Sequence, residues 1–414
     1  MESKDGRLRL ELPPMVRCPA EKRQNMGFFR KYFLQGQELV KPLRGVRHES
    51  ETISKPSFVE RNRKYIGLLI PFLFMHTVWW TLAFRYNILE RFKTYYEMPI
   101  TMIFGATVAG MTSEGGGAVA FPVMTLLLHF DARQARDFSL MIQSCGMTSA
   151  AFTIMWMGIV IEWSAIILCT LGSTVGIIIG LTFVDELLTG AEKKMLFVAI
   201  WASFALSLWL LNHEQHRRTY DRIQNMTIGK GSVLLATGFV GGLCSAFAGS
   251  GVDICSFSML TLLFRVSEKT ATPTSVVLMA ANTCVGFFWR QLIMTAVDPV
   301  VWMHFSTSVP VVVLCAPLGS LLASHFHRLV LASFVYILEA LALIGFLATR
   351  PDLHLVLIGA GIICCSLGFF LGISRIGRYY DDIYAPAIAM PSPPAPYKTR
   401  TVVHFSDVHD FRGK

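Results

Sequence analysis

The chain has 414 residues, of which 53% are hydrophobic and 16% are charged, and its mean hydropathy is +0.49. Soluble domains carry roughly 25% charged residues, so this composition excludes an ordinary soluble protein. Apolar runs long enough to cross a bilayer, which takes about 20 residues, follow one another closely. The sequence therefore predicts an integral, multi-pass protein of the plasma membrane or an organelle membrane, surrounded by the lipid bilayer.

The net charge of +9 is concentrated in a basic, polar tail over residues 1–64. In a membrane protein such an excess reflects topology and lipid headgroups, so the N-terminus is expected on the cytoplasmic side. For the same reason no nucleic-acid partner is predicted. No apolar run precedes residue 65, so a cleavable signal peptide is not expected.

The predicted elements begin with an extra first span inside residues 65–97. Two long apolar stretches, 98–128 and 231–264, are each interrupted by a glycine-rich break. With the uninterrupted spans, they give an all-α polytopic membrane protein of about nine or ten segments. The uninterrupted spans are expected at residues 65–84, 138–160, 163–183, 195–211, 274–296, 301–323, 329–348 and 353–374.

The two halves of the membrane part, residues 98–211 and 231–348, resemble an internal repeat. Thr125 matches Thr261 at an offset of 261 − 125 = 136, and the same offset pairs Gly105 with Gly241. A polar linker, 212–230, separates the halves. If each broken stretch returns to the side it entered, the halves are inverted; if each crosses fully, they are parallel. Loop charges do not decide between the two topologies.

The remaining parts of the chain give little chemistry. Residues 375–414 are rich in proline and are expected to be a disordered tail after a last span at 349–374. Eight of the nine cysteines lie in apolar runs, and no CxxC spacing occurs. Neither a metal site, nor a disulfide framework, nor a cofactor is therefore predicted.

The glycine-rich breaks are the strongest functional signal. Glycine is a poor helix residue, by about 1 kcal/mol relative to alanine, so two clusters at equivalent places predict broken helices. A helix that begins inside the membrane presents free N–H groups, and these with the helix dipole can bind an anion. Close packing of helices through small residues is the alternative reading. The candidate substrate-binding residues are Ser113, Gly115, Gly116, Gly117, Thr125, Ser139, Gly249, Ser250, Gly251, Thr261, Ser275 and Asn282.

Two carboxyl groups lie at the breaks, Glu114 in the first and Asp253 just after the second. Ionisable groups at membrane depth are costly and are candidates for function, so either one is a candidate to carry a coupling proton. Arg133 and Arg136 follow the first break and are expected to attract anions to the mouth of the site. Arg290 is expected to be an interfacial arginine near the end of a span.

These residues resemble the sulfite exporter family of the TauE/SafE type, also called the toluene-sulfonate uptake permeases. The resemblance covers about residues 98–374 and implies a duplicated transporter of sulfite, sulfonates or related organosulfur anions. Two places differ from the family pattern, namely Val252 and Asp253 after the second break and the segment 136–139. The resemblance is carried by Gly105, Gly110, Gly115, Gly116, Gly117 and Pro122, by Gly241, Gly242, Gly249, Ser250 and Gly251, by the segment 271–276, and by Gly172, Gly176 and Gly180.

We therefore expect a transporter of small anions that works by alternating access, and not an enzyme. A passive anion channel is the nearest alternative, followed by a receptor or scaffold. An intramembrane serine hydrolase would need glycine at position 248, where this chain has Ala248. The sequence leaves the oligomeric state open, with a homodimer as one option.

Overall fold

The computed structural model describes residues 62–112, 114–213, 219–323, 326 and 328–389. Within these residues the fold is helical, and its only β-structure is an isolated bridge between Tyr220 and Val266. Nine helices in this part of the chain are long and apolar enough to cross a membrane. The predicted all-α, polytopic class is confirmed. Most of the predicted basic tail, residues 1–61, lies outside the described residues.

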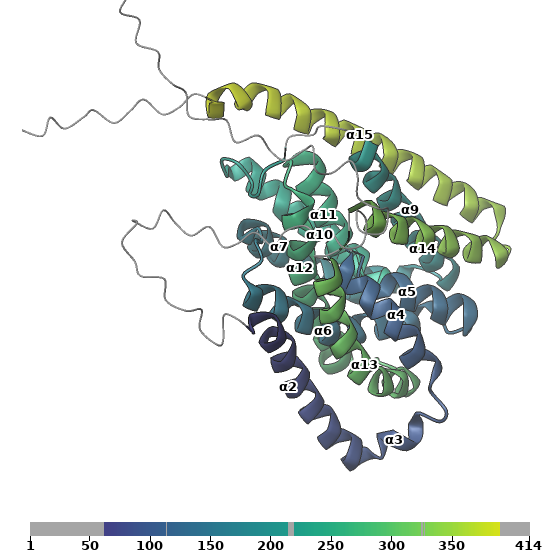
Figure 1. Cartoon of the computed structure of the whole chain (residues 1–414). Coiled ribbons are helices and arrows are strands. Elements are labelled where there is room, and N and C mark those ends of the chain that lie inside the picture. The colour runs from purple at the N-terminus through teal and green to yellow at the C-terminus, as the bar shows by residue number, and fades with distance from the viewer. Residues whose placement is uncertain (1–61, 113, 214–218, 324–325, 327, 390–414) are drawn as a thin grey trace, which may run out of the picture.

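Each half of the chain has a broken pair of helices followed by three longer helices (Figure 1). The first half comprises α2 (Arg63–Tyr86), α3 (Ile88–Arg91), α4 (Glu97–Met111), α5 (Gly117–Pro122), η3 (Val123–Leu127), α6 (Ala132–Met157), α7 (Trp163–Ile179), η4 (Gly180–Val184), α8 (Asp185–Leu187) and α9 (Gly190–His213). The second comprises α10 (Ile228–Ala248), α11 (Val252–Ser258), η5 (Met259–Leu263), α12 (Glu268–Phe288), η6 (Trp289–Ile293), α13 (Pro299–Ala323), α14 (Arg328–Ala348) and α15 (Leu353–Ala389).

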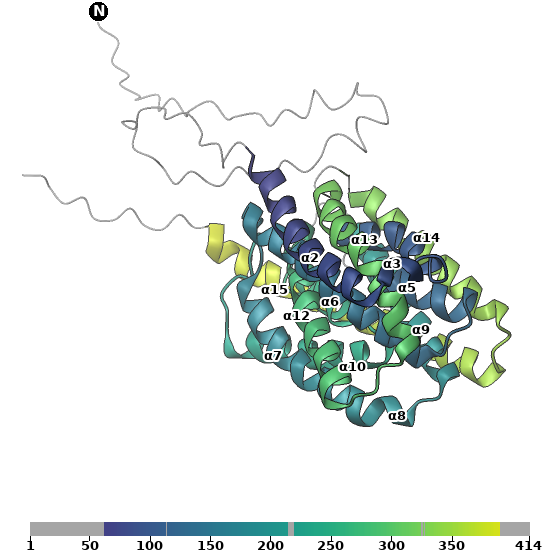
Figure 2. The same cartoon turned by 90° about the horizontal axis from the view of Figure 1, so that it is seen from below.

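Helix α6 lies at the centre of the bundle and α15 at its edge. In the most apolar 18-residue stretch of α6, 78% of the residues are buried inside the protein, whereas in that of α15 only 6% are buried. Figure 1 shows α2 and α15 on opposite sides of the other helices, and in Figure 2, seen from below, α15 passes behind them. Large apolar side chains such as Leu171, Leu341 and Leu357 are exposed, as expected where helices face lipid.

Glycines allow the closest helix crossings. Helices α7 and α10 meet through Gly176 and Gly242, where an added Cβ would collide with the backbone carbonyls of Phe239 and Ser173. Membrane helices associate through small residues because there is no hydrophobic drive between them in lipid. Gly172 and Gly176, which resemble the family's spaced glycines, therefore serve to pack the two halves against each other.

The first broken pair, residues 97–127, begins and ends at the same place. Tyr95, just before α4, has its ring 4.9 Å from that of His304 in α13. Phe130, just after the pair, has its ring 5.1 Å from the same histidine. The pair is therefore a hairpin that enters the bundle and returns to the side on which α6 and α13 begin. We name this side the Asp131 face, after the N-cap residue of α6.

The second broken pair, residues 228–263, returns to the opposite side. Tyr220, in the linker before α10, donates from its backbone N–H to the carbonyl of Arg265, just after the pair, at 2.9 Å. The amide of Ile223 in the same linker donates to Glu162 Oε2 at 3.0 Å, where α7 begins. We name this side the Glu162 face. The two hairpins thus enter from opposite faces, which is the inverted arrangement that loop charges left undecided.

The element boundaries of the two halves correspond closely. Helix α6 begins at Ala132 and α12 at Glu268, and the π-helical turns Val123–Leu127 and Met259–Leu263 end the two hairpins. Each of these pairs is separated by 136 positions, the offset that aligned Thr125 with Thr261. A common origin for the halves remains a prediction, but their local architecture is the same.

The predicted end of the last span was wrong. Disorder was expected from residue 375, yet α15 continues to Ala389. The expectation rested on prolines, and the first of these is Pro386, so nothing interrupts helix propagation after the apolar run. Gly377 in this extension lies against the backbone carbonyl of Leu263 at the end of the second hairpin.

The packing role of Gly176 can be tested by adding a single methyl group. Alanine is the better helix former by about 1 kcal/mol, but overpacking typically costs about 1–3 kcal/mol. We expect Gly176→Ala to lower the unfolding temperature of the purified protein. Gly361→Ala in α15, where no atom lies within 4 Å of the new Cβ, should not lower it. Equal changes in both variants would contradict the assignment.

Candidate functional site

The two glycine-rich breaks lie directly against each other. Ser250 Oγ, in the second break, donates to the backbone carbonyl of Glu114, in the first, at 3.2 Å. A Cβ on Gly117 would lie only 3.3 Å from Ser250 Cβ. Residues that are 136 positions apart in the chain are therefore brought into contact at the centre of the bundle. We call this contact and the side chains around it the central site.

Glycine is required at two of these positions by the backbone itself. Gly115 has φ +71° and Gly249 has φ +78°, a left-handed conformation that side chains disfavour. Space is also lacking, because a Cβ on Gly249 would lie 2.6 Å from Ser139 Cβ. The breaks therefore depend on glycine both for their turns and for their close approach.

Gln143 of α6 joins the two breaks. Its Nε2 donates to the carbonyls of Ser139 and Gly249, both at 2.9 Å. Its Oε1 lies 2.5 Å from the position that a Cβ on Gly115 would occupy. A glutamine inside a membrane span commonly bonds a neighbouring helix. In the structure its partner is the break at the end of α10, so this side chain ties α6 to both hairpins.

Several buried polar atoms at the central site have no hydrogen-bond partner among the described residues. They include Ser139 Oγ, Gln143 Oε1 and both side-chain polar atoms of the neighbouring Asn282. Ser139 Oγ lies 3.6 Å from the Cβ position of Gly117 and 3.3 Å from that of Gly249, and so between the breaks. Buried polar groups are almost always hydrogen-bonded in proteins. This concentration therefore indicates a place for a polar ligand or for water.

Three carboxyl groups gather at the site. Glu114, Asp253 and Glu339 are 0%, 1% and 6% exposed. Both Glu339 of α14 and Asp253 interact electrostatically with Glu114. None of them forms an ion pair with a basic residue in the described part of the chain. Sequence reasoning missed Glu339, although a lone carboxylate inside the apolar span 329–348 was the signal that would have found it.

Asp253 occupies the start of the second hairpin's returning helix. Its Oδ2 accepts from Ser250 Oγ at 2.8 Å. The backbone amides of Gly251 and Ile254 also interact with its carboxyl group. A carboxylate at a helix N-terminus is stabilised by the free N–H groups there. The predicted anion-binding position of this helix is therefore filled by a side chain of the protein itself.

The other predicted site residues lie at different distances from this contact. The hydroxyls of Thr125, Thr261 and Ser275 are buried and bond carbonyls within their own helices. Gly251 packs against α10, where an added Cβ would lie 2.6 Å from Cys244 Cβ and 3.0 Å from the carbonyl oxygen of Gly241. These hydrogen bonds stabilise the helices that carry the three hydroxyls.

Two predicted residues are closer to the central site, and one is outside the described residues. Gly116 lies against Met102 and Gln143. Asn282 is fully buried, and neither of its side-chain polar atoms has a partner in the described part of the chain. It follows Met279, whose side chain touches Gly115, by one helical turn, so it borders the same region. Ser113 lies outside the described residues.

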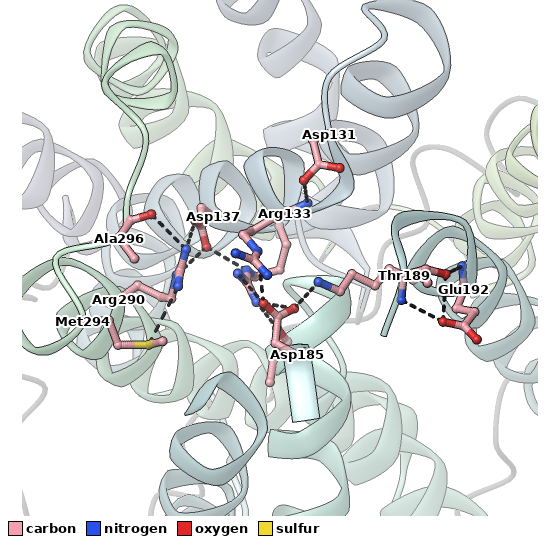
Figure 3. A network of polar contacts seen from close by, with 12 residues as sticks. Asp131, Arg133, Asp137, Asp185, Thr189, Glu192, Arg290, Met294 and Ala296 are labelled. Carbon is pink, nitrogen blue, oxygen red and sulfur yellow. Dashed lines mark hydrogen bonds and ion pairs between the residues drawn. The ribbon is translucent and has the colours of Figure 1, made fainter. Parts of the chain in front are cut away.

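A buried ion-pair network lies next to the site on the side of the Asp131 face (Figure 3). Arg290 donates to Asp137 Oδ1 at 2.9 Å and to Oδ2 at 2.6 Å, and it is only 3% exposed. The interfacial position expected for Arg290 was therefore wrong. Its partner lies 153 residues earlier in the chain and was not visible in the sequence. Arg136 is likewise buried, whereas the side chain of Arg133 is 48% exposed.

Comparison with known proteins agrees with this architecture. The sequence model of the family described as Sulfite exporter TauE/SafE matches residues 98–346, from the start of the first hairpin to the end of α14. The chain matches no curated protein and no solved structure. The matched region contains both hairpins and all of the central site, while α2 and α15 lie outside it. This chain belongs to the sulfite exporter TauE/SafE family of membrane transporters.

Proposed function

We propose that this protein carries a small organosulfur anion, such as sulfite or a sulfonate, across the membrane by alternating access. The observation that supports the proposal is the contact of two broken hairpins, surrounded by buried polar atoms without partners. The family to which the chain belongs is one of anion transport. Broken helices that meet inside a bundle are where secondary transporters bind their substrates.

Several groups of the central site are suited to hold an anion. Ser139 Oγ has a hydroxyl hydrogen to donate and lies between the breaks. The helices at residues 117–127 and 252–263 both start at the breaks, so their N-terminal N–H groups and dipoles favour negative charge there. An oxyanion with three or four oxygens would bond to hydroxyl and backbone donors without a charged side chain.

The carboxyl groups connect anion binding to protonation. Asp253 already places negative charge at the start of the helix at residues 252–263, and Glu114 and Glu339 lie nearby. Several negative charges buried together without a cation are strongly unfavourable. An anion therefore enters only when protons neutralise these carboxyl groups, and we propose that Glu114 and Asp253 carry the coupling proton. This coupling gives cotransport of the anion with protons.

Alternating access is supported by the opposite entry of the two hairpins. The first hairpin connects the site to the Asp131 face and the second connects it to the Glu162 face. Ser139, Ser250 and Asp253 are all buried, so the site is closed to solvent in this conformation. A passive channel would need a path open at both faces at once, and we therefore favour a transporter.

We place the Glu162 face on the cytoplasmic side. Arg63, Lys64, Lys230 and Lys269 lie near this face, at the starts of α2, α10 and α12, and the sequence that precedes α2 is basic. Positively charged segments next to spans favour the cytoplasm. Asn225-Met226-Thr227 has the N-glycosylation pattern, and on the cytoplasmic side it would carry no glycan.

The role of the central site can be tested by flux of radiolabelled sulfite into proteoliposomes. A hydrogen bond to a charged ligand contributes about 1.5–3 kcal/mol, so Ser139→Ala should raise KM roughly 10- to 100-fold. Ser232→Ala, an exposed serine of α10 that bonds the carbonyl of Ile228, serves as the control. Saturable flux with an unchanged KM in Ser139→Ala would argue against the site.

The coupling role is tested separately from binding. In Asp253→Asn and Glu114→Gln the side chain can no longer release a proton, so a proton gradient should cease to drive sulfite accumulation. Exchange of labelled for unlabelled sulfite, which needs no net proton movement, should remain. Glu192→Gln is the control, because Glu192 caps α9 through Thr189 at the rim of the bundle. Gradient-driven accumulation that survives both site substitutions would exclude these residues as proton carriers.

A further inference from the structure

The ion-pair network next to the central site connects both halves of the protein. Asp137 of α6 accepts from Arg136 Nε at 2.7 Å and from Arg290 of η6. Asp185 of α8 pairs with Arg136 at 3.1 Å and with Lys193 of α9 at 2.8 Å. Arg133 pairs with Asp185 at 3.4 Å from the exposed rim. Figure 3 shows Asp137 between Arg290 and Arg133, with Asp185 below Arg133.

The network contacts the end of α10, next to the second break. Arg136 Nη1 donates to the carbonyl of Ala246, in the last turn of α10 before the break. The carbonyl of Arg136 lies 3.1 Å from the Cβ position of Gly249, and Ser139 of the central site is one helical turn further along α6. Any path from the central site to the Asp131 face between α6, α10 and η6 therefore passes these side chains.

The charges of the network favour anions. Four basic side chains, Arg133, Arg136, Lys193 and Arg290, surround the two carboxylates of Asp137 and Asp185, a formal excess of two positive charges. Buried ion pairs add little stability compared with apolar residues of the same volume. An apolar plug would therefore close this end of the protein equally well, but it would give an anion nothing to bind on its way out.

We propose that this network is an anion-selective gate that closes the central site toward the Asp131 face. The inference rests on the proposed function, since it takes the central site as the place of transport. Opening separates Arg290 in the second half from Asp137 in the first. An anion that leaves the central site takes the place of a carboxylate on Arg136 and Arg290, so the arginines exchange one anionic partner for another. A cation meets the excess of positive charge in the same network instead.

The gate can be tested without knowledge of the substrate, by the reactivity of a thiol placed at the central site. The probes are two membrane-impermeant methanethiosulfonates, the anionic sulfonatoethyl and the cationic trimethylammonium-ethyl reagent, added to the full-length protein with Ser139→Cys from the Asp131 face. The parent with Ser139 corrects for the native cysteines. We expect slow labelling, faster for the anionic reagent than for the cationic one.

The gate is then weakened by Asp137→Asn combined with Arg290→Gln, which removes the pair without leaving one buried charge unpaired. We expect the Ser139→Cys thiol to react at least about tenfold faster with the cationic reagent and selectivity for the anionic one to fall. The unfolding temperature should change little. Gln134→Leu is the matched control, because Gln134 also joins the halves at this face through Asp298, outside the network. It should leave labelling unchanged.

The outcomes separate the gate from the proposed function. Equal labelling with and without the pair would overturn the gate even if sulfite flux is found. Changed labelling in a protein without sulfite flux would support the gate and remove the substrate. If the double variant does not fold, Arg290→Lys, which keeps the charge but loses the two-point contact with Asp137, should give a smaller increase in the same direction. No increase in Arg290→Lys would then overturn the proposal.

Discussion

A helix that stops inside a bilayer leaves backbone N–H and C=O groups that lipid cannot satisfy. In this protein Gln143 satisfies a carbonyl at the end of α10, because its amide donates to the carbonyl of Gly249. Ser250 does the same for the first break, where it donates to the carbonyl of Glu114. Each hairpin therefore needs the other and α6 in order to exist at this depth. The hairpins can satisfy each other only because they enter from opposite faces and meet at α6. The burial of α6 and the close glycine crossings hold these elements together.

The same constraint explains why chemistry concentrates at the centre. Polar groups are present there because broken backbone demands them, and once present they provide donors for an anion. Glycine keeps the two breaks close, and the lack of side chains leaves Ser139 and Asp253 as the groups that a ligand would meet. Under the proposed function, stability and binding draw on the same residues, so substitutions here should alter both, whereas the glycines between α7 and α10 serve packing.

Much of this arrangement could be predicted from sequence, because the signals are local. Glycine clusters mark the breaks, and the repeat offset aligns α6 with α12 and the two π-helical turns. The features that could not be predicted depend on contacts between residues that are far apart in the sequence. Arg290 and Asp137 are 153 residues apart, and Glu339 reaches Glu114 from α14. The direction of each hairpin was also hidden, since it depends on contacts such as those of His304 with Tyr95 and Phe130.

Ser250 has a single hydroxyl hydrogen and two neighbouring acceptors, the carbonyl of Glu114 and the carboxyl of Asp253. When Asp253 is ionised it competes for that hydrogen, and the carbonyl of the other hairpin goes without. When Asp253 is protonated, its own O–H donates to Ser250 Oγ, and the serine hydrogen is free for Glu114. The state of one carboxyl group therefore sets whether Ser250 bonds to a backbone 136 positions away in the chain, while the contact of Gln143 with Gly249 does not depend on it.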